Sequence, residues 1–227
     1  MHKQISVIIP CFNGKKYIRE TLQTVQVQGD VIGEILVIDD ASTDGSAAYV
    51  QGLNVPNLTL HRLAHNQGIS AARNVAVAHA KFPYIAFLDA DDLWTDGRSE
   101  VLMNALDAHA TPWALGAVEH FLSDDYKGTA QYALPPVQTG YFAGAMLVKT
   151  DFFKTVGPFN EALKVGEFID WYDRARTLAP PPAVQEYVVL KRRIHGANTS
   201  ILGDNTKAKD YLKVARDAIE RRKKTQQ

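Results

Sequence analysis

The sequence predicts an α/β fold, a single domain whose mostly parallel central sheet is covered by helices on both faces. Three apolar runs, at 5–10, 34–39 and 84–88, are continuous and contain many β-branched residues. Such runs are typical of strands buried on both faces of a parallel sheet. Helical segments alternate with the runs and polar turns follow them, which is the pattern of βαβ units.

The first half of the chain is expected to supply the parallel strands. Apolar residues at 18, 22 and 25 recur at helical spacing, and the segment before the third apolar run is rich in alanine. The expected elements are a strand at 5–10, a helix at 15–28, a strand at 34–39, a short helix ending at 50, a weaker strand at 58–62, a helix at 69–80 and a strand at 84–88.

The second half is expected to be less regular. A polar insert at 123–139 separates two strand-like segments, and three consecutive prolines at 180–182 stop a region of helix and loop. The expected elements are a helix at 98–108, strands at 113–122, 141–149 and 183–193, and a final helix over 202–227.

Bulk composition excludes several classes of protein. The 227 residues carry no net charge, so the chain as a whole offers no electrostatic surface for nucleic acid. The single cysteine, Cys11, excludes an internal disulfide framework and suits a reducing compartment. No apolar run reaches the length of a transmembrane helix, and the N-terminus lacks the features of a signal peptide. We therefore expect a cytoplasmic, soluble protein.

Three carboxylates, Asp89, Asp91 and Asp92, follow the buried strand at 84–88 directly. Ligands of open α/β sheets bind at the carboxyl ends of strands, and like charges this close repel one another unless a cation or hydrogen-bond donors neutralise them. Asp89 and Asp91 alternate along an extended chain and could share Mg²⁺ or Mn²⁺. The alternative is an acidic turn that caps a helix.

Three further clusters of polar residues lie at expected strand ends or helix starts. Asp39 and Asp40 could accept hydrogen bonds from a base or a ribose, although Thr43 or Asp44 beside them could simply cap a helix. Arg73, one turn into an expected helix, could reach a phosphate, a carboxylate of the acidic cluster, or only a surface partner. His195 could bind a metal or a phosphate, or be structural.

Taken together, these segments resemble the family 2 glycosyltransferases, which have the GT-A fold. The resemblance spans nearly all of residues 5–200, in the family's order. The matching segments are SVIIPCFNGKKYIRETLQTVQVQ (6–28), EILVIDDASTDGS (34–46), NQGISAARN (66–74), YIAFLDADDLW (84–94), FAGAMLVKTDFFKTVGPFNEAL (142–163) and RRIHGANTS (192–200).

The resemblance implies roles for particular residues. Pro10, Phe12 and Asp40 would line the nucleobase pocket with Asp39 close by, and Arg73 would approach the nucleotide. Asp89 and Ala90 would contact the nucleotide sugar. The divalent cation, Mn²⁺ or Mg²⁺, would be bound by Asp91, Asp89 and His195.

The chain departs from the family at the catalytic base. The usual Gly-Glu-Asp element reads Gly166-Glu167-Phe168 here, so Phe168 occupies the position of the base. Glu167 or Asp170 must then supply the carboxylate, with Glu167 preferred. The alternative is that both are acids favoured at a helix N-terminus by the helix dipole.

The activity that the resemblance implies is metal-dependent, inverting transfer of one sugar from a nucleoside diphosphate, UDP or dTDP by preference, to an acceptor hydroxyl in the synthesis of a polysaccharide or glycoconjugate. The acceptor would be a saccharide, a lipid-linked glycan or a peptide. Two alternatives are a nucleotidyltransferase acting on sugar phosphates and a nucleotide-sugar-binding pseudoenzyme, which the missing base favours.

The expected domain covers residues 1–203, with a nucleotide-binding half at 1–95 and an acceptor-binding half at 96–203. The basic tail at 204–227 is expected to be a solvated helix. Its alternative is peripheral contact with an anionic membrane, at the inner face, through cations and an apolar stripe of Tyr211, Ala215, Ala218 and Ile219.

Overall fold

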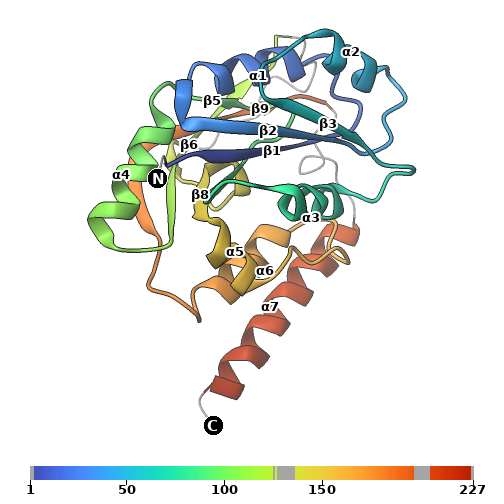
Figure 1. The fold of residues 1–227 in the computed structure, drawn as a ribbon. Helices are drawn as coiled ribbons and strands as arrows, with labels where there is room; N and C mark the ends of the chain where they lie inside the picture. The colour runs from blue at the N-terminus through green and yellow to red at the C-terminus, as the bar shows by residue number, and fades with distance from the viewer. Residues whose placement is uncertain (1–2, 125, 127–135, 197–204, 226–227) are drawn as a thin grey trace.

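The computed structural model describes residues 3–124, 126, 136–196 and 205–225. Its described strands form one sheet in the order β3-β2-β1-β4-β8-β6-β9-β5, with β7 beside β6 (Figure 1). The strands are β1 (Ile5–Cys11), β2 (Ile32–Asp39), β3 (Leu58–Arg62), β4 (Tyr84–Phe87), β5 (Leu93–Trp94), β6 (Trp113–Leu122), β7 (Gln138–Thr139), β8 (Met146–Lys149) and β9 (Ala183–Ile194). The α-helices are α1 (Ile18–Gln26), α2 (Ser46–Gly52), α3 (Ile69–His79), α4 (Arg98–His109), α5 (Thr150–Val156), α6 (Glu167–Ala175) and α7 (Asn205–Thr225).

Strands β1 to β4 form the parallel half of the sheet, as predicted. Strand β1 lies at its centre, is buried along its whole length, and pairs in parallel with both β2 and β4. Its register aligns Cys11 with Asp39 at the carboxyl end of β2. The turns that follow β1, β2 and β4 therefore open on the same edge of the sheet, which is where parallel sheets bind ligands.

The second half adds strands of both directions. Strand β8 runs antiparallel to β4 and β6, whereas β9 runs parallel to β6 along most of its length. The strand predicted at 141–149 begins only at Met146, because residues 143–145 form a 3-10 turn instead. At the centre of this turn, a Cβ atom on Gly144 would lie 3.0 Å from the side chain of Leu190, so the backbone approaches β9 closely.

Helices cover both faces of the sheet, so the predicted fold class is confirmed. One buried cluster joins the sheet to α1, α2 and α4, and a second joins its other face to α3, α5 and α6 (Figure 1). The second cluster contains Trp113 of β6 and Trp171 of α6, whose rings meet edge to face at 5.7 Å. The helix that carries Glu167 is thereby fixed to the core.

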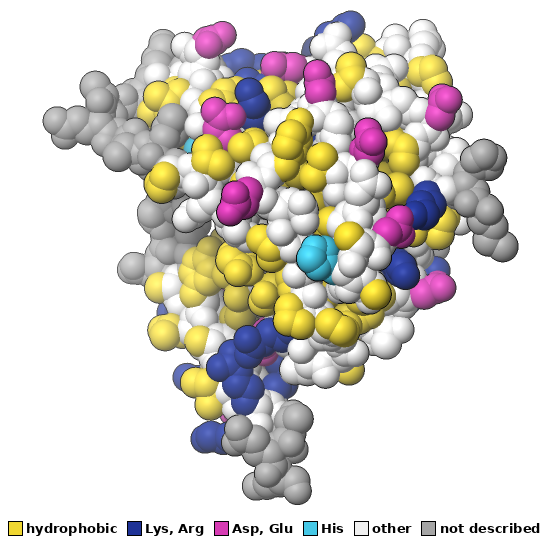
Figure 2. All heavy atoms as spheres, turned by 90° about the vertical axis from the view of Figure 1, so that its left-hand side faces the viewer, with side chains coloured by type: hydrophobic (Ala, Val, Ile, Leu, Met, Phe, Trp, Pro, Cys, Tyr) yellow, Lys and Arg dark blue, Asp and Glu magenta, His cyan; other side chains and the backbone are white. Residues whose placement is uncertain are grey.

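Helix α7 is largely exposed to solvent, as the sequence favoured, and one side of it packs along α6. Val214 and Ala218 are the buried residues of its described part, whereas Tyr211 and Ile219 of the expected apolar stripe are exposed. Figure 2 shows Lys and Arg side chains gathered at the lower end of the molecule, where α7 ends in Figure 1. No helix in the described ranges is long and apolar enough to cross a membrane.

Candidate active site

A cleft of about 1710 Å³ opens at the carboxyl edge of the parallel strands. Its lining combines turns that follow β1, β2 and β4 with residues of the second half and one residue of α7. Of the residues that the sequence singled out, those that line it are Pro10, Phe12, Asp40, Arg73, Asp89, Ala90, Asp91, Asp92, Glu167, Phe168, His195 and Tyr211. Asp39 and Asp170 are not among the described residues of its lining.

Asp40 fixes a loop of the cleft. Its two carboxylate oxygens accept hydrogen bonds from the backbone N–H groups of Gln67 (2.7 Å) and Gly68 (2.8 Å). Asp39 is fully buried behind it, and its Oδ2 lies 3.3 Å from Nε of Arg62. Asp40 therefore shapes the loop at 66–68 before α3. The direct contact of Asp39 or Asp40 with a nucleotide stays a prediction.

Arg73 joins the two halves of the cleft. One guanidinium nitrogen donates to Asp89 Oδ1 at 2.6 Å and another to Glu167 Oε1 at 2.7 Å. The side chain is 3% exposed. Burial alone would lower the pKa of Arg73, but the charges of Asp89 and Glu167 raise it above its ordinary value. Arg73 is therefore a fixed cation between two carboxylates, not the surface ion pair that the sequence also allowed.

Asp91, in the acidic turn at 89–92, contacts His195, the residue that follows β9. Nε2 of His195 lies 2.8 Å from Asp91 Oδ2, and the ring of Tyr17 packs at 5.0 Å from the imidazole. Asp92 is buried and accepts the backbone N–H of Arg193 at 2.9 Å. Burial, followed by the charges of Asp91 and Asp89, raises the pKa of Asp92 well above its ordinary value.

Arg193 was not singled out in the sequence, although it adjoins His195 in the segment RRIH. Its Nε donates to the backbone carbonyl of Asp91 at 2.8 Å, and a second nitrogen lies 2.6 Å from Glu20 of α1. Arg193 thus supports the acidic turn from behind. The rest of that segment, 197–200, lies outside the described residues.

Asp91 and His195 carry ligand atoms of the kinds that divalent cations accept. Asp91 Oδ2 and His195 Nε2 are joined by a hydrogen bond of 2.8 Å, so a cation would have to replace this bond to take both atoms as ligands. A carboxylate and an imidazole are ordinary ligands of such ions, which take further oxygens from substrate phosphates and water. Asp89 is paired with Arg73, and within the described ranges no three His, Cys, Asp or Glu side chains converge as a metal-binding group.

The two candidate bases point in different directions from α6. Glu167, the first residue of the helix, lines the cleft with a 15% exposed side chain. Phe168 is buried and packs on Trp171, so the position of the usual base belongs to the core.

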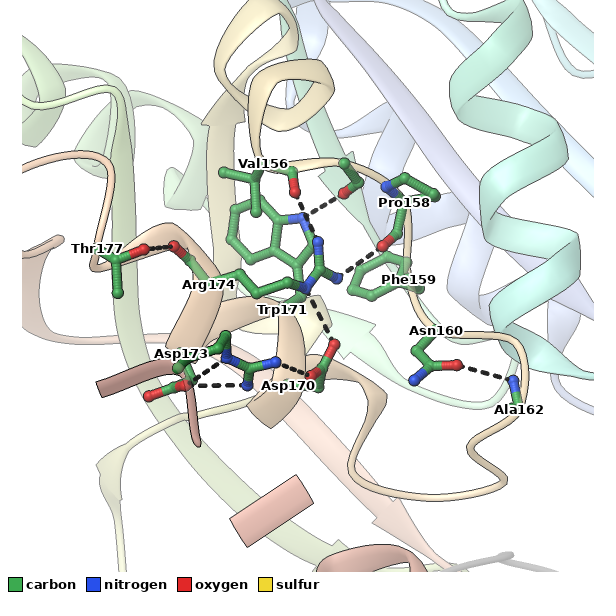
Figure 3. Close-up of polar contacts among 12 residues, drawn as sticks. Val156, Pro158, Phe159, Asn160, Ala162, Asp170, Trp171, Asp173, Arg174 and Thr177 are labelled. Carbon is green, nitrogen blue, oxygen red and sulfur yellow. Dashed lines mark hydrogen bonds and ion pairs between the residues drawn. The ribbon is translucent and has the colours of Figure 1, made fainter. Parts of the chain in front are cut away.

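Asp170 lies on the face of α6 that meets α7. One of its oxygens accepts from Arg174 and the other from Arg221 of α7, both at 3.1 Å (Figure 3). Arg174 also donates to the backbone carbonyls of Val156 and Pro158. This arrangement does not support Asp170 as the base, because its carboxylate is occupied outside the cleft. Asp170 and Arg174 are four residues apart, and this spacing on a helix was the sequence signal for their ion pair.

Comparisons with known proteins agree with this architecture. TuaG of Bacillus subtilis (strain 168), whose name assigns it to teichuronic acid biosynthesis, is 37% identical over 98 residues, which cover 42% of this chain and 39% of TuaG. WfgD of Escherichia coli, a UDP-Glc:α-D-GlcNAc-diphosphoundecaprenol β-1,3-glucosyltransferase, is 30% identical over 102 residues, 45% of this chain and 40% of WfgD. The chain thus spans less than half the length of these relatives.

Among solved structures, S. aureus TarS 1–349 in complex with UDP-GlcNAc superposes with a TM-score of 0.75 at 24% identity, covering 95% of this chain and 65% of that one. This likeness shows a shared fold. The model of the family described as "Glycosyl transferase family 2" matches residues 6–160, more than half of the sequence. The chain therefore belongs to glycosyl transferase family 2.

Proposed function

We propose that this chain transfers one sugar from a nucleoside diphosphate sugar, preferably a UDP-sugar, to an acceptor hydroxyl with inversion at the anomeric carbon. The observation that carries the proposal is the Arg73 bridge, which holds Glu167 of the second half beside Asp89 of the acidic turn in one cleft. Family membership and the UDP-GlcNAc complex of the TarS structure support the choice of reaction and donor.

In this proposal the donor occupies the side of the cleft built by β1, β2 and β4. Pro10, Phe12 and the loop held by Asp40 receive the base, and Asp89 and Ala90 lie next to the ribose and pyrophosphate. Asp91 and His195 would hold Mn²⁺ or Mg²⁺, which when bound stabilises the charge on the departing nucleoside diphosphate.

Glu167 is the proposed general base. The acceptor oxygen forms a bond to the anomeric carbon, the bond from that carbon to the diphosphate oxygen breaks, and the acceptor proton passes to Glu167. The sugar becomes oxocarbenium-like during this exchange. Arg73 fixes the position of the Glu167 carboxylate through their hydrogen bond, so it acts as a positioning residue.

The test is a thermal-shift titration of UDP and UDP-sugars with and without Mn²⁺, followed by turnover of the donor. A ligand that binds only the native state raises the melting temperature. We expect a metal-dependent shift in the wild type that Asp91→Ala removes, and a kcat at least about a hundredfold lower in Glu167→Gln with unchanged donor affinity. A wild type that binds no nucleotide, or a Glu167→Gln variant with normal turnover, would contradict the proposal.

We further propose a sugar carried on a lipid diphosphate as the acceptor, because the name of WfgD specifies such an acceptor. The protein would then work at the inner membrane face, with helix α7 as the contact. Lys209, Lys213 and Arg216 recur along its exposed side, which suits anionic headgroups.

A second candidate is a nucleotide-sugar-binding chain without transfer activity. The observation that favours it is Phe168, which fills the position of the family's base with a buried ring. Tight UDP-sugar binding without transfer or hydrolysis in the turnover assay would establish this candidate instead.

A further inference from the structure

The cleft has a second side that the donor contacts described above do not use. Its volume of about 1710 Å³ exceeds the 300–1,000 Å³ common for sites of single small ligands. Three large side chains at this side are substantially exposed, and the second half and α7 supply them: Tyr141 (51%), Ile169 (43%) and Tyr211 (48%). Exposed apolar surface at a cleft is typical of a binding site.

Tyr211 lies next to the proposed base through the backbone of Gly166. A Cβ atom on Gly166 would lie 3.3 Å from two atoms of the Tyr211 ring. Gly166 has a φ of +79°, which glycine adopts at little cost, and Glu167 follows it as the first residue of α6. The ring therefore covers the start of the helix that presents the base.

The preceding residue of α7 holds the same loop. Asp210 Oδ2 accepts the backbone N–H groups of Lys164 at 2.9 Å and Val165 at 3.4 Å. The first described turns of α7 are thus tied to the segment that leads into Glu167, and Tyr211 is not a loosely placed surface ring. A planar aromatic face beside polar groups is suited to the apolar face of a pyranose ring.

We propose that Tyr211 forms an acceptor subsite, where its ring stacks against the acceptor's sugar and directs a hydroxyl toward Glu167. The subsite lies on α7, beyond the residues 6–160 that match the family model. The ligand class proposed for the second side of the cleft is a pyranoside, and this assignment rests on the proposed glycosyl transfer.

The experiment uses the full chain saturated with UDP and titrates in an alkyl ester of N-acetylglucosaminyl diphosphate as the probe. The variants are Tyr211→Ala, Tyr211→Phe and Leu212→Ala, whose native side chain is 67% exposed on the same helix and is not part of the described cleft lining. We expect Tyr211→Ala to weaken probe binding at least about tenfold. Tyr211→Phe retains the ring and should bind nearly as the wild type does, and Leu212→Ala should be unchanged.

The affinity for UDP separates this inference from the proposed function. UDP should bind all four proteins equally, and a wild type that does not bind UDP overturns the glycosyl transfer itself. Normal UDP binding combined with no probe binding, or with equal probe binding by wild type and Tyr211→Ala, overturns the Tyr211 subsite alone. A Tyr211→Ala variant that loses UDP and probe together also overturns it, because the ring would then support the whole cleft.

Discussion

At the scale of single residues, the site depends on one buried guanidinium group, that of Arg73, which two carboxylates share. Arg73 contacts Asp89 and Glu167, which lie in different halves of the chain. Removing Arg73 would leave the largely buried carboxylate of Glu167, 15% exposed, charged and without compensation, and would leave Asp89, 35% exposed, without its partner. The same contact therefore matters both to folding and to the placement of the proposed base.

Replacing Arg73 by Ala should lower the free energy of unfolding by about 3–5 kcal/mol, measured by urea denaturation. Arg73→Lys keeps a charge but loses the fork that reaches both carboxylates, so we expect most of the stability back and kcat still reduced. The control is Lys191→Ala, since Lys191 also pairs with a carboxylate, that of Glu119, but both side chains are exposed, by 47% and 42%; the loss of unfolding free energy should stay below about 1 kcal/mol. Equal losses of unfolding free energy in the two alanine variants would contradict the conclusion that Arg73 is a buried cation shared by two carboxylates.

At the scale of elements, α6 and α7 act as a pair. Arg221 of α7 bonds to Asp170 and Asp173 of α6, and Asp173 also pairs with Arg176. Burial alone would raise the pKa of Asp173, but hydrogen bonds and charge from Arg221, with Arg222 and Arg176, lower it below its ordinary value. Because the folded pKa is lowered, this carboxylate contributes stability above the unfolded pKa and loses it as pH falls.

Acidification should therefore loosen α7 before the sheet unfolds. Amide exchange protection in α7, corrected for the intrinsic rate, should drop as pH falls below the unfolded pKa of about 4, whereas β1 stays protected. In Arg221→Gln the protection of α7 should already be low at neutral pH and depend less on acid. Protection of α7 that is unaffected by both changes would show that apolar contacts alone hold the helix.

There is a physical reason why individual strands could be predicted from the sequence. Strand β3 was predicted with both ends correct, because continuous or alternating apolar patterns are local signals. The second partner of Asp170, Arg221 of α7, was not predictable, since it lies 51 residues further along the chain and nothing local connects them. The contact of Arg73 with both carboxylates and the reversed direction of β8 likewise depend on how distant segments meet.

For the whole molecule, α7 has two differently used sides. Val214 and Ala218 face the protein, whereas the aliphatic side chain of Ile219 is 53% exposed beside the row of cations. Exposed aliphatic and basic side chains on one helix are typical of contact with the surface of a membrane. Such a contact would hold the Tyr211 side of the cleft near lipid-linked acceptors.

We expect the chain to sediment with vesicles of phosphatidylglycerol but not with phosphatidylcholine alone, and salt should weaken this binding. Reversing Lys209, Lys213 and Arg216 to Glu should abolish it. Reversing Lys81, Lys149 and Lys154, which are exposed elsewhere on the molecule, changes the net charge equally and should have less effect. If both triple variants lose binding alike, net charge rather than α7 is responsible.

The antiparallel direction of β8 affects how easily the acceptor specificity of such a cleft can change. Because β8 is antiparallel to β4, its entrance lies at the same edge as the exit of β4, so residues 141–144 reach the cleft beside the acidic turn. Segments that precede a strand thereby meet segments that follow one. Insertions or substitutions before β8 can therefore change which acceptor the cleft binds. The hydrogen bonds that shape the donor side of the cleft would stay the same.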